Sequence, residues 1–171
     1  MYGKIFAKGI GYYFFAELIC IFLVFSLGLI GNVFFRVLSG VCCLGILICL
    51  IINFTINCQK EIKFNYDDNG AKPIIITGIS ASFVYLILYI LLGAAKYGLI
   101  PDNFYRIYKL LNAPVMTVLN LISSDITASS ISIAGFTVML LLALIPMFTV
   151  AVTYIMCRKG VIPEDFIFQK K

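Results

Sequence analysis

The sequence predicts an all-α integral membrane protein, with four transmembrane helices and an interfacial or re-entrant amphipathic helix between the third and the fourth. Of its 171 residues, 62% are hydrophobic and only 12% are charged. Soluble domains are typically about 45–50% apolar and about 25% charged. The charged residues gather in short segments between long apolar runs. Because the length fits one domain, we expect residues 1–171 to form a single transmembrane domain.

The first two spans come from one apolar run. Residues 18–59 contain a single charge, Arg36. As one helix this run would be about 63 Å long, roughly twice the thickness of a hydrocarbon core. It must therefore fold back, and the turn-forming residues lie within 31–40. We expect the two spans at about residues 10–33 and 38–57.

The third and fourth spans are separate apolar runs. Pro73 stands where the start of a helix accepts proline. It opens a charge-free run that predicts a span at about residues 73–96. Residues 126–157 also lack charge but exceed the length of one span, so the fourth span is placed at about 133–156.

Residues 102–124 predict a helix that does not cross the membrane. Aromatic, aliphatic and basic side chains recur at helical spacing in residues 104–111, which is typical of a helix in the membrane interface. The expected apolar face holds Phe104, Ile107, Tyr108 and Leu111. The apolar residues that follow are too few for a span. Candidate contacts with lipid headgroups or a partner are Tyr105, Arg106, Tyr108 and Lys109.

The basic residues predict the orientation. With four spans, nine fall on the side of the two termini: Lys4, Lys8, Lys60, Lys63, Lys72, Arg158, Lys159, Lys170 and Lys171. Four fall on the other side: Arg36, Lys96, Arg106 and Lys109. Because basic residues are enriched in cytoplasmic loops, we expect a multi-pass protein of the cell membrane with both termini in the cytoplasm. A fifth span would remove this asymmetry.

Glu17 is the candidate ion or proton site. An acid inside a span is costly and usually functional. However, residues 18–35 are already long enough to span, so the sequence favours an interfacial position for Glu17 beside Tyr12 and Tyr13. A buried proton or cation site is the alternative.

Gly78 and Ser82 form a small-residue patch that predicts close helix packing, either within the chain or against a partner.

The chain has no His, and its six Cys form no CxxC pair, which excludes His-ligated metal or haem sites and a Ser-His-Asp triad. We therefore expect no cofactor and no metal. The net charge of +5 contains no basic block, so nucleic acid is not an expected partner.

Three functions follow in order of preference. The favoured one is a non-catalytic accessory or partner-binding subunit, which contacts the lipid bilayer and another membrane protein or a second copy. The alternative is a small transporter or channel for an ion or small molecule, which uses Glu17 and polar groups within the spans. A lipid-active enzyme with Tyr105, Arg106 and Lys109 at the headgroups comes last, because no nucleophile or acid–base pair accompanies them.

The predicted topology can be tested by cysteine labelling. In a cysteine-free background, single cysteines at Asn69, Asn103 and Gln169 should divide into two classes. The probe at Asn103 should react from outside the cell, and the other two only after permeabilisation. Labelling at Gln169 from outside would contradict the four-span prediction.

Overall fold

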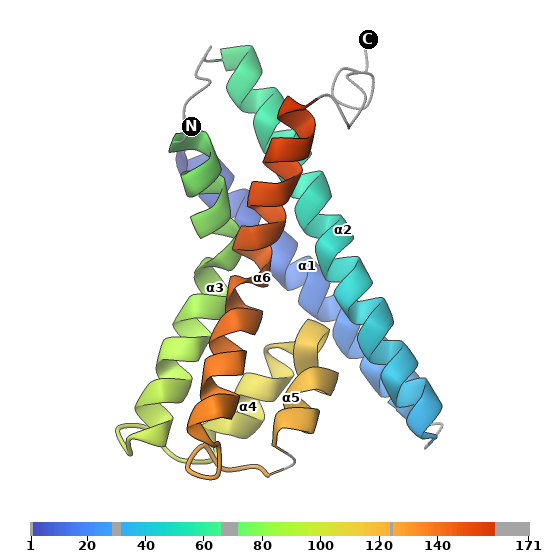
Figure 1. Ribbon diagram of the computed structural model, residues 1–171, viewed down its shortest axis with the longest axis vertical. Coiled ribbons are helices and arrows are strands. Elements are labelled where there is room, and N and C mark those ends of the chain that lie inside the picture. Colours follow the sequence, from blue (N-terminus) through green and yellow to red (C-terminus); the bar gives the residue numbers. More distant parts are fainter. Residues whose placement is uncertain (1, 29–31, 66–71, 124, 160–171) are drawn as a thin grey trace.

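The computed structural model describes residues 2–28, 32–65, 72–123 and 125–159, and all secondary structure in these residues is helical (Figure 1). In chain order the helices are α1 (Tyr2–Gly28), α2 (Val33–Asn65), α3 (Lys72–Lys96), α4 (Phe104–Leu110), the 3-10 helix η1 (Ala113–Val115), α5 (Met116–Ile122) and α6 (Ile133–Arg158). Two of the labelling positions proposed above, Asn69 and Gln169, lie outside the described residues.

Within the described residues, α1, α2, α3 and α6 are long and apolar enough to cross a membrane. The prediction of four long apolar helices is therefore confirmed. The third and fourth begin at Lys72 and Ile133, close to the expected positions. The first begins at Tyr2 rather than near residue 10, and the second runs from Val33 to Asn65 rather than over 38–57.

The start of α2 explains why the first two helices differ from expectation. The Asn32 side chain accepts a hydrogen bond from the Phe34 backbone N–H at 3.0 Å, as an N-terminal cap does. Ser39, which was expected in the turn, instead donates to the Arg36 carbonyl within the helix at 2.8 Å. The cap at Asn32 therefore starts the helix before Arg36.

The long helices form two pairs, α1 with α2 and α3 with α6 (Figure 1). The pairs meet near the end that holds the start of α1 and the ends of α2 and α6. They diverge toward the opposite end. The contacts of α1 with α3, and of α2 with α6, join the two pairs. The divergence leaves an opening that the remaining short helices occupy.

Residues 104–122, here called the wedge hairpin, comprise α4, η1 and α5 and lie in this opening (Figure 1). Helix α4 packs on α3, α5 packs on α2, and η1 at the apex contacts both α1 and α2. Tyr105, Tyr108 and Leu119 are fully buried between the elements. The wedge hairpin thus fills the space between the two pairs with its own apolar core.

The small residues of α3 are used for packing inside the chain. Gly78 and Ser82 are both buried. A Cβ added at Gly78 would lie 3.2 Å from Met147 Cγ of α6, and one added at Gly9 of α1 would lie 2.7 Å from the Ser80 backbone oxygen of α3. Small residues therefore allow α3 to approach α1 and α6 closely.

A pair of glycine substitutions in α1 tests this packing. Gly9→Ala should push α1 away from Ser80 and lower the unfolding free energy by about 1–3 kcal/mol, the usual effect of overpacking. Gly11→Ala should leave stability unchanged or raise it by up to about 1 kcal/mol, because nothing lies within 4 Å of the added Cβ. Thermal unfolding in detergent, followed by circular dichroism, compares the two. Equal midpoints would contradict the close approach of α1 and α3.

Candidate functional site

Glu17 lies inside the protein, close to the middle of α1. Its side chain is 5% exposed. In the apolar stretch Gly3–Leu27 it stands 14 residues from one end and ten from the other, which is about 21 Å and about 15 Å of helix. The Glu17 side chain is therefore enclosed by other parts of the chain, which the sequence did not indicate. Helix α1 begins and ends earlier in the chain than the apolar run indicated, and Glu17 consequently lies near its centre.

One carboxylate oxygen of Glu17 binds the apex of the wedge hairpin. Oε2 accepts a hydrogen bond from the backbone N–H of Ala113 at 3.0 Å. Ala113 is the first residue of η1, and its N–H is free because the helix of the preceding segment has ended. Sequence reasoning missed this partner. The signal for it was Pro114, which marks a new helical start and hence an unpaired N–H beside it.

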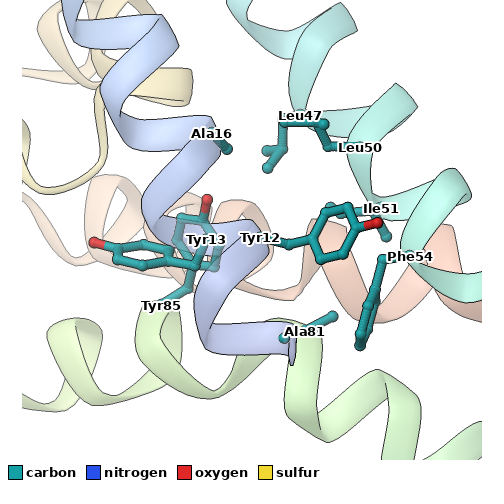
Figure 2. Close-up of a pocket in the computed structure, with 10 residues that line it drawn as sticks. Tyr12, Tyr13, Ala16, Leu47, Leu50, Ile51, Phe54, Ala81 and Tyr85 are labelled. Carbon is teal, nitrogen blue, oxygen red and sulfur yellow. The ribbon is translucent and has the colours of Figure 1, made fainter. Parts of the chain in front are cut away.

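Tyr13, one helical turn before Glu17, holds the same apex. Its hydroxyl donates to the Leu111 carbonyl at 2.7 Å. The Tyr13 ring packs edge-to-face against Tyr85 of α3, with ring centroids 5.0 Å apart (Figure 2). Two adjacent turns of α1 therefore bind the backbone that connects α4 with η1. This contact joins the N-terminal helix to residues almost 100 positions later.

Three buried polar atoms have no hydrogen-bond partner among the described residues: Glu17 Oε1, Tyr85 Oη and Ser82 Oγ. Most buried polar groups in proteins are paired, so such atoms call for an explanation. Other hydroxyls in the long helices donate to the carbonyl one turn earlier, namely Thr55, Ser80, Thr149 and Thr153. The unpaired atoms are thus confined to α1 and α3.

A small cavity of about 10 Å³ lies next to this region, between α1, α2 and α3 (Figure 2). Tyr12 and Tyr13 project from α1 on opposite sides, Tyr12 toward Phe54 and Tyr13 toward Tyr85. A cavity of this size holds about one water molecule. It is lined by Gly9, Tyr12, Tyr13, Ala16, Leu47, Leu50, Ile51, Phe54, Ala81 and Tyr85.

On the other side of Glu17, two buried cysteines join α1 to α2. Cys20 Sγ lies 3.7 Å from the Cys43 carbonyl, and Cys43 Sγ lies 3.8 Å from the Cys20 carbonyl. Ala113 packs with them in one small apolar cluster. In the part of the chain that the structure describes, no three Cys, Asp or Glu side chains lie close enough together to hold a metal ion. The carboxyl of Glu17 is thus surrounded by aromatic, apolar and sulfur-containing side chains.

The candidate headgroup contacts of the wedge hairpin lie mostly inside the protein. Tyr105, Tyr108 and Lys109 are buried, and Arg106 alone of the four is exposed. Tyr105 donates to the Leu119 carbonyl at 3.3 Å, and burial raises the pKa of Tyr105 to about 12. The orientation expected for this helix is therefore wrong at Tyr108, which faces the core rather than the acyl chains.

Lys109 binds backbone carbonyls instead of headgroups. Its Nζ donates to the carbonyls of Ser123 and Asp125 at 2.7 and 2.9 Å and lies 4.4 Å from the centre of the Tyr105 ring. Burial lowers the pKa of Lys109, and the nearby Asp125 carboxylate partly offsets this effect. Helix ends leave carbonyls without partners, and a lysine is a suitable donor for them. Helical periodicity alone cannot reveal this use of a basic residue.

The loop that follows the wedge hairpin is fixed to the end of α3. The Asp102 carboxylate accepts hydrogen bonds from the backbone N–H and the hydroxyl of Ser129, at 2.8 and 2.6 Å. These bonds lower the pKa of Asp102. Lys96 donates to the Ile131 carbonyl at 2.7 Å. The segments before and after the hairpin are therefore joined to each other through Asp102 and Ser129, and the later segment is also bound to Lys96 of α3, whereas the apex of the hairpin is bound to α1.

Comparison with known proteins gave no match: none was found among protein-family models, curated proteins or solved structures. Functional inference consequently depends on the geometry around Glu17. The site consists of the buried carboxyl group of Glu17, of which one oxygen is hydrogen-bonded and the other has no partner among the described residues. Tyrosines and a break in the helical backbone lie around it.

Replacement of Lys109 tests how the wedge hairpin is held. Lys109→Met keeps the length of the side chain but removes two hydrogen bonds from a charged donor, so the local opening free energy should fall by about 1–3 kcal/mol. Hydrogen exchange measured by mass spectrometry should show faster exchange over residues 119–131. The control Arg106→Gln changes an exposed basic residue of the same helix and should leave exchange unchanged. Equal protection in both variants would contradict the role of Lys109.

Proposed function

We propose that this chain is a small multi-pass membrane transporter or channel, in which Glu17 binds and releases a proton or a monovalent cation. The observation that carries the proposal is the Glu17 carboxyl group, which is buried near the middle of an apolar helix and has one oxygen without a partner. Ionisable groups at such depth are expensive and commonly belong to ion pathways or proton relays.

A purely structural role explains Glu17 less well. The hydrogen bond from the Ala113 N–H needs only one neutral oxygen acceptor. A glutamine or serine could supply this acceptor without the several kcal/mol that an uncompensated buried charge costs. The second oxygen of Glu17, which no described residue binds, has no part in attaching the hairpin. A group that changes its charge during transport accounts for both oxygens.

The wedge hairpin supports the same function. In a membrane, interrupted helical backbone is tolerated only where protein covers it or where it lines an aqueous path. Transporters commonly place such broken helices at their binding sites. The apex of the hairpin lies beside the middle of α1 and presents a free N–H to Glu17. We therefore interpret residues 102–124 as a re-entrant hairpin that enters the bilayer and leaves it on the same side.

The proposed orientation follows from the distribution of basic residues. Both termini would face the cytoplasm of a cell, because nine basic residues lie on their side and four on the other. The re-entrant hairpin would then enter from outside. Movement of its apex away from Glu17 would expose the carboxyl to the outer side, and Tyr13, which packs on Tyr85, lies one helical turn from Glu17 toward the cytoplasmic end of α1.

The other candidate functions receive less support. A partner-binding subunit was favoured by the sequence, yet Gly78 and Ser82, its candidate contacts, are buried in packing within the chain. Contact with lipid is enough to explain the exposed apolar side chains on the long helices, so these side chains do not indicate a partner protein. A lipid-active enzyme would need Tyr105 and Lys109 at the headgroups, and both are buried.

Ion flux into liposomes tests the role of Glu17. The purified chain is reconstituted in vesicles that contain a pH-sensitive dye, and a potassium diffusion potential is imposed. The wild-type chain should admit protons faster than protein-free vesicles. Glu17→Gln keeps an acceptor for the Ala113 N–H but cannot ionise, so it should lower the protein-dependent rate at least tenfold, corresponding to about 1.4 kcal/mol or more. A sodium-sensitive dye repeats the measurement for Na⁺.

The matched control is Asp125→Asn, which neutralises an exposed acid away from α1 and should retain the wild-type rate. Circular dichroism and gel filtration establish that each variant is folded. Equal flux for the wild type and Glu17→Gln, or wild-type flux no faster than that of empty vesicles for both ions, would contradict the proposal.

A further inference from the structure

A second, larger groove lies on the outer surface of the α1–α2 pair. Its volume is about 480 Å³, and it is lined by Lys8, Gly11, Tyr12, Phe15, Leu50 and Asn53. Ligand sites in proteins commonly measure about 300–1,000 Å³. Tyr12 and Leu50 separate the groove from the small cavity described above, because they line both. The groove does not include Glu17, so inferences about it do not depend on the proposed transport function.

Polar groups occupy the end of the groove near the start of α1. Lys8 forms an ion pair with Glu61. The Asn57 side chain donates to the Tyr12 hydroxyl at 3.3 Å and to Asn53 Oδ1 at 3.2 Å. Asn53, Asn57 and Glu61 are spaced by four residues and therefore share one face of α2. Four hydrogen-bonding side chains and one acid thus follow the line where α1 and α2 meet.

The other end of the groove is apolar. Gly11 leaves open space above the helix backbone, since nothing lies within 4 Å of a Cβ added there. Phe15 is exposed beside it, and Leu50 closes the α2 side. In the direction from Lys8 to Phe15 the groove therefore changes from charged to apolar. This order matches an amphiphile whose headgroup lies at the membrane surface and whose chain points into the bilayer.

The depth and the charge of the polar end indicate an anionic headgroup. Lys8 lies five residues beyond the start of the apolar stretch at Gly3, about 8 Å along the helix, and its long side chain can extend toward the surface. Lys4 precedes it by one turn on the same face of α1. Lys60 lies on the α2 face that carries Asn53. Against these three lysines stands one acid, Glu61.

We propose that this groove binds one anionic phospholipid. The headgroup phosphate contacts Lys8, with Lys4 and Lys60 nearby. The side-chain amides of Asn53 and Asn57 face the polar ester region of the lipid. One acyl chain crosses Gly11 and packs between Phe15 and Leu50. Basic residues at the cytoplasmic surface attract anionic lipid, which agrees with the orientation expected from the charges. The lipid would cover polar side chains that otherwise face hydrocarbon.

Two substitutions separate the acyl-chain contact from the headgroup contact. Gly11→Leu places a side chain in the groove, and the fold should tolerate it because nothing lies within 4 Å of a Cβ added at this position. Its matched control is Gly45→Leu, also in open space on an exposed face of α2 but outside the groove. Lys8→Gln removes the cation and its ion pair with Glu61 but keeps a polar side chain in the groove lining, and it serves as an independent test if Gly11→Leu does not fold.

Native mass spectrometry of the delipidated chain measures binding of phosphatidylglycerol and of phosphatidylcholine with the same acyl chains. The wild type and Gly45→Leu should retain one phosphatidylglycerol, bound at least tenfold more tightly than phosphatidylcholine. Gly11→Leu should weaken both lipids at least tenfold, and Lys8→Gln should abolish the preference between them. Excess glycerol phosphate should not displace the lipid.

Three outcomes would overturn the proposal. The first is equal binding of the two lipids by the wild-type chain. The second is unchanged binding in both Gly11→Leu and Lys8→Gln. The third is a dimer that carries no lipid and dissociates in Gly11→Leu, which would assign the groove to a second copy of the chain.

Discussion

The attachment of the wedge hairpin to α1 is the contact on which the remaining architecture depends. Glu17 and Tyr13 bind the backbone at the apex, at Ala113 and Leu111, while α4 packs on α3 and α5 packs on α2. The contacts of α1 with α3 and of α2 with α6 join the two helix pairs, and the hairpin fills the opening where the pairs diverge (Figure 1). In an apolar surrounding, hydrogen bonds of this kind have no water to replace them, so their loss would leave buried backbone groups unpaired.

Helix α1 has three roles, two of them on the face that carries Gly9, Tyr13 and Glu17. Gly9 allows α3 to approach, Tyr13 and Glu17 face the hairpin, and Lys8 and Tyr12 border the outer groove. The proposed ion site and the proposed lipid site are therefore separated by the width of one helix. A change of lipid in the groove would act on Tyr12, whose ring also lines the small cavity next to Tyr13.

The sequence predicted the long helices because hydrophobic length is a strong and local signal. The second helix contains the span expected at 38–57 but begins earlier, because the cap at Asn32 and not the charge at Arg36 determines where α2 starts. The position of Glu17 could not be obtained from its neighbours, since its burial depends on Ala113, 96 residues later. Lys109 was misjudged for a similar reason: its partners are backbone carbonyls, which helical periodicity does not report. Patterns of side chains thus predict the long helices, whereas contacts with backbone far away in the sequence determine the site around Glu17.

The contacts of the wedge hairpin also bear on how the chain is assembled. Its main contacts are with α1, α2 and α3, all of which precede it in the sequence. Helices of seven residues are marginal by themselves, so the hairpin requires a surface that is already formed. During synthesis that surface exists before α6 emerges, and α6 then packs on α3 and α2. The order of the segments in the chain therefore makes the helices that cover the interrupted backbone available before the hairpin itself is complete.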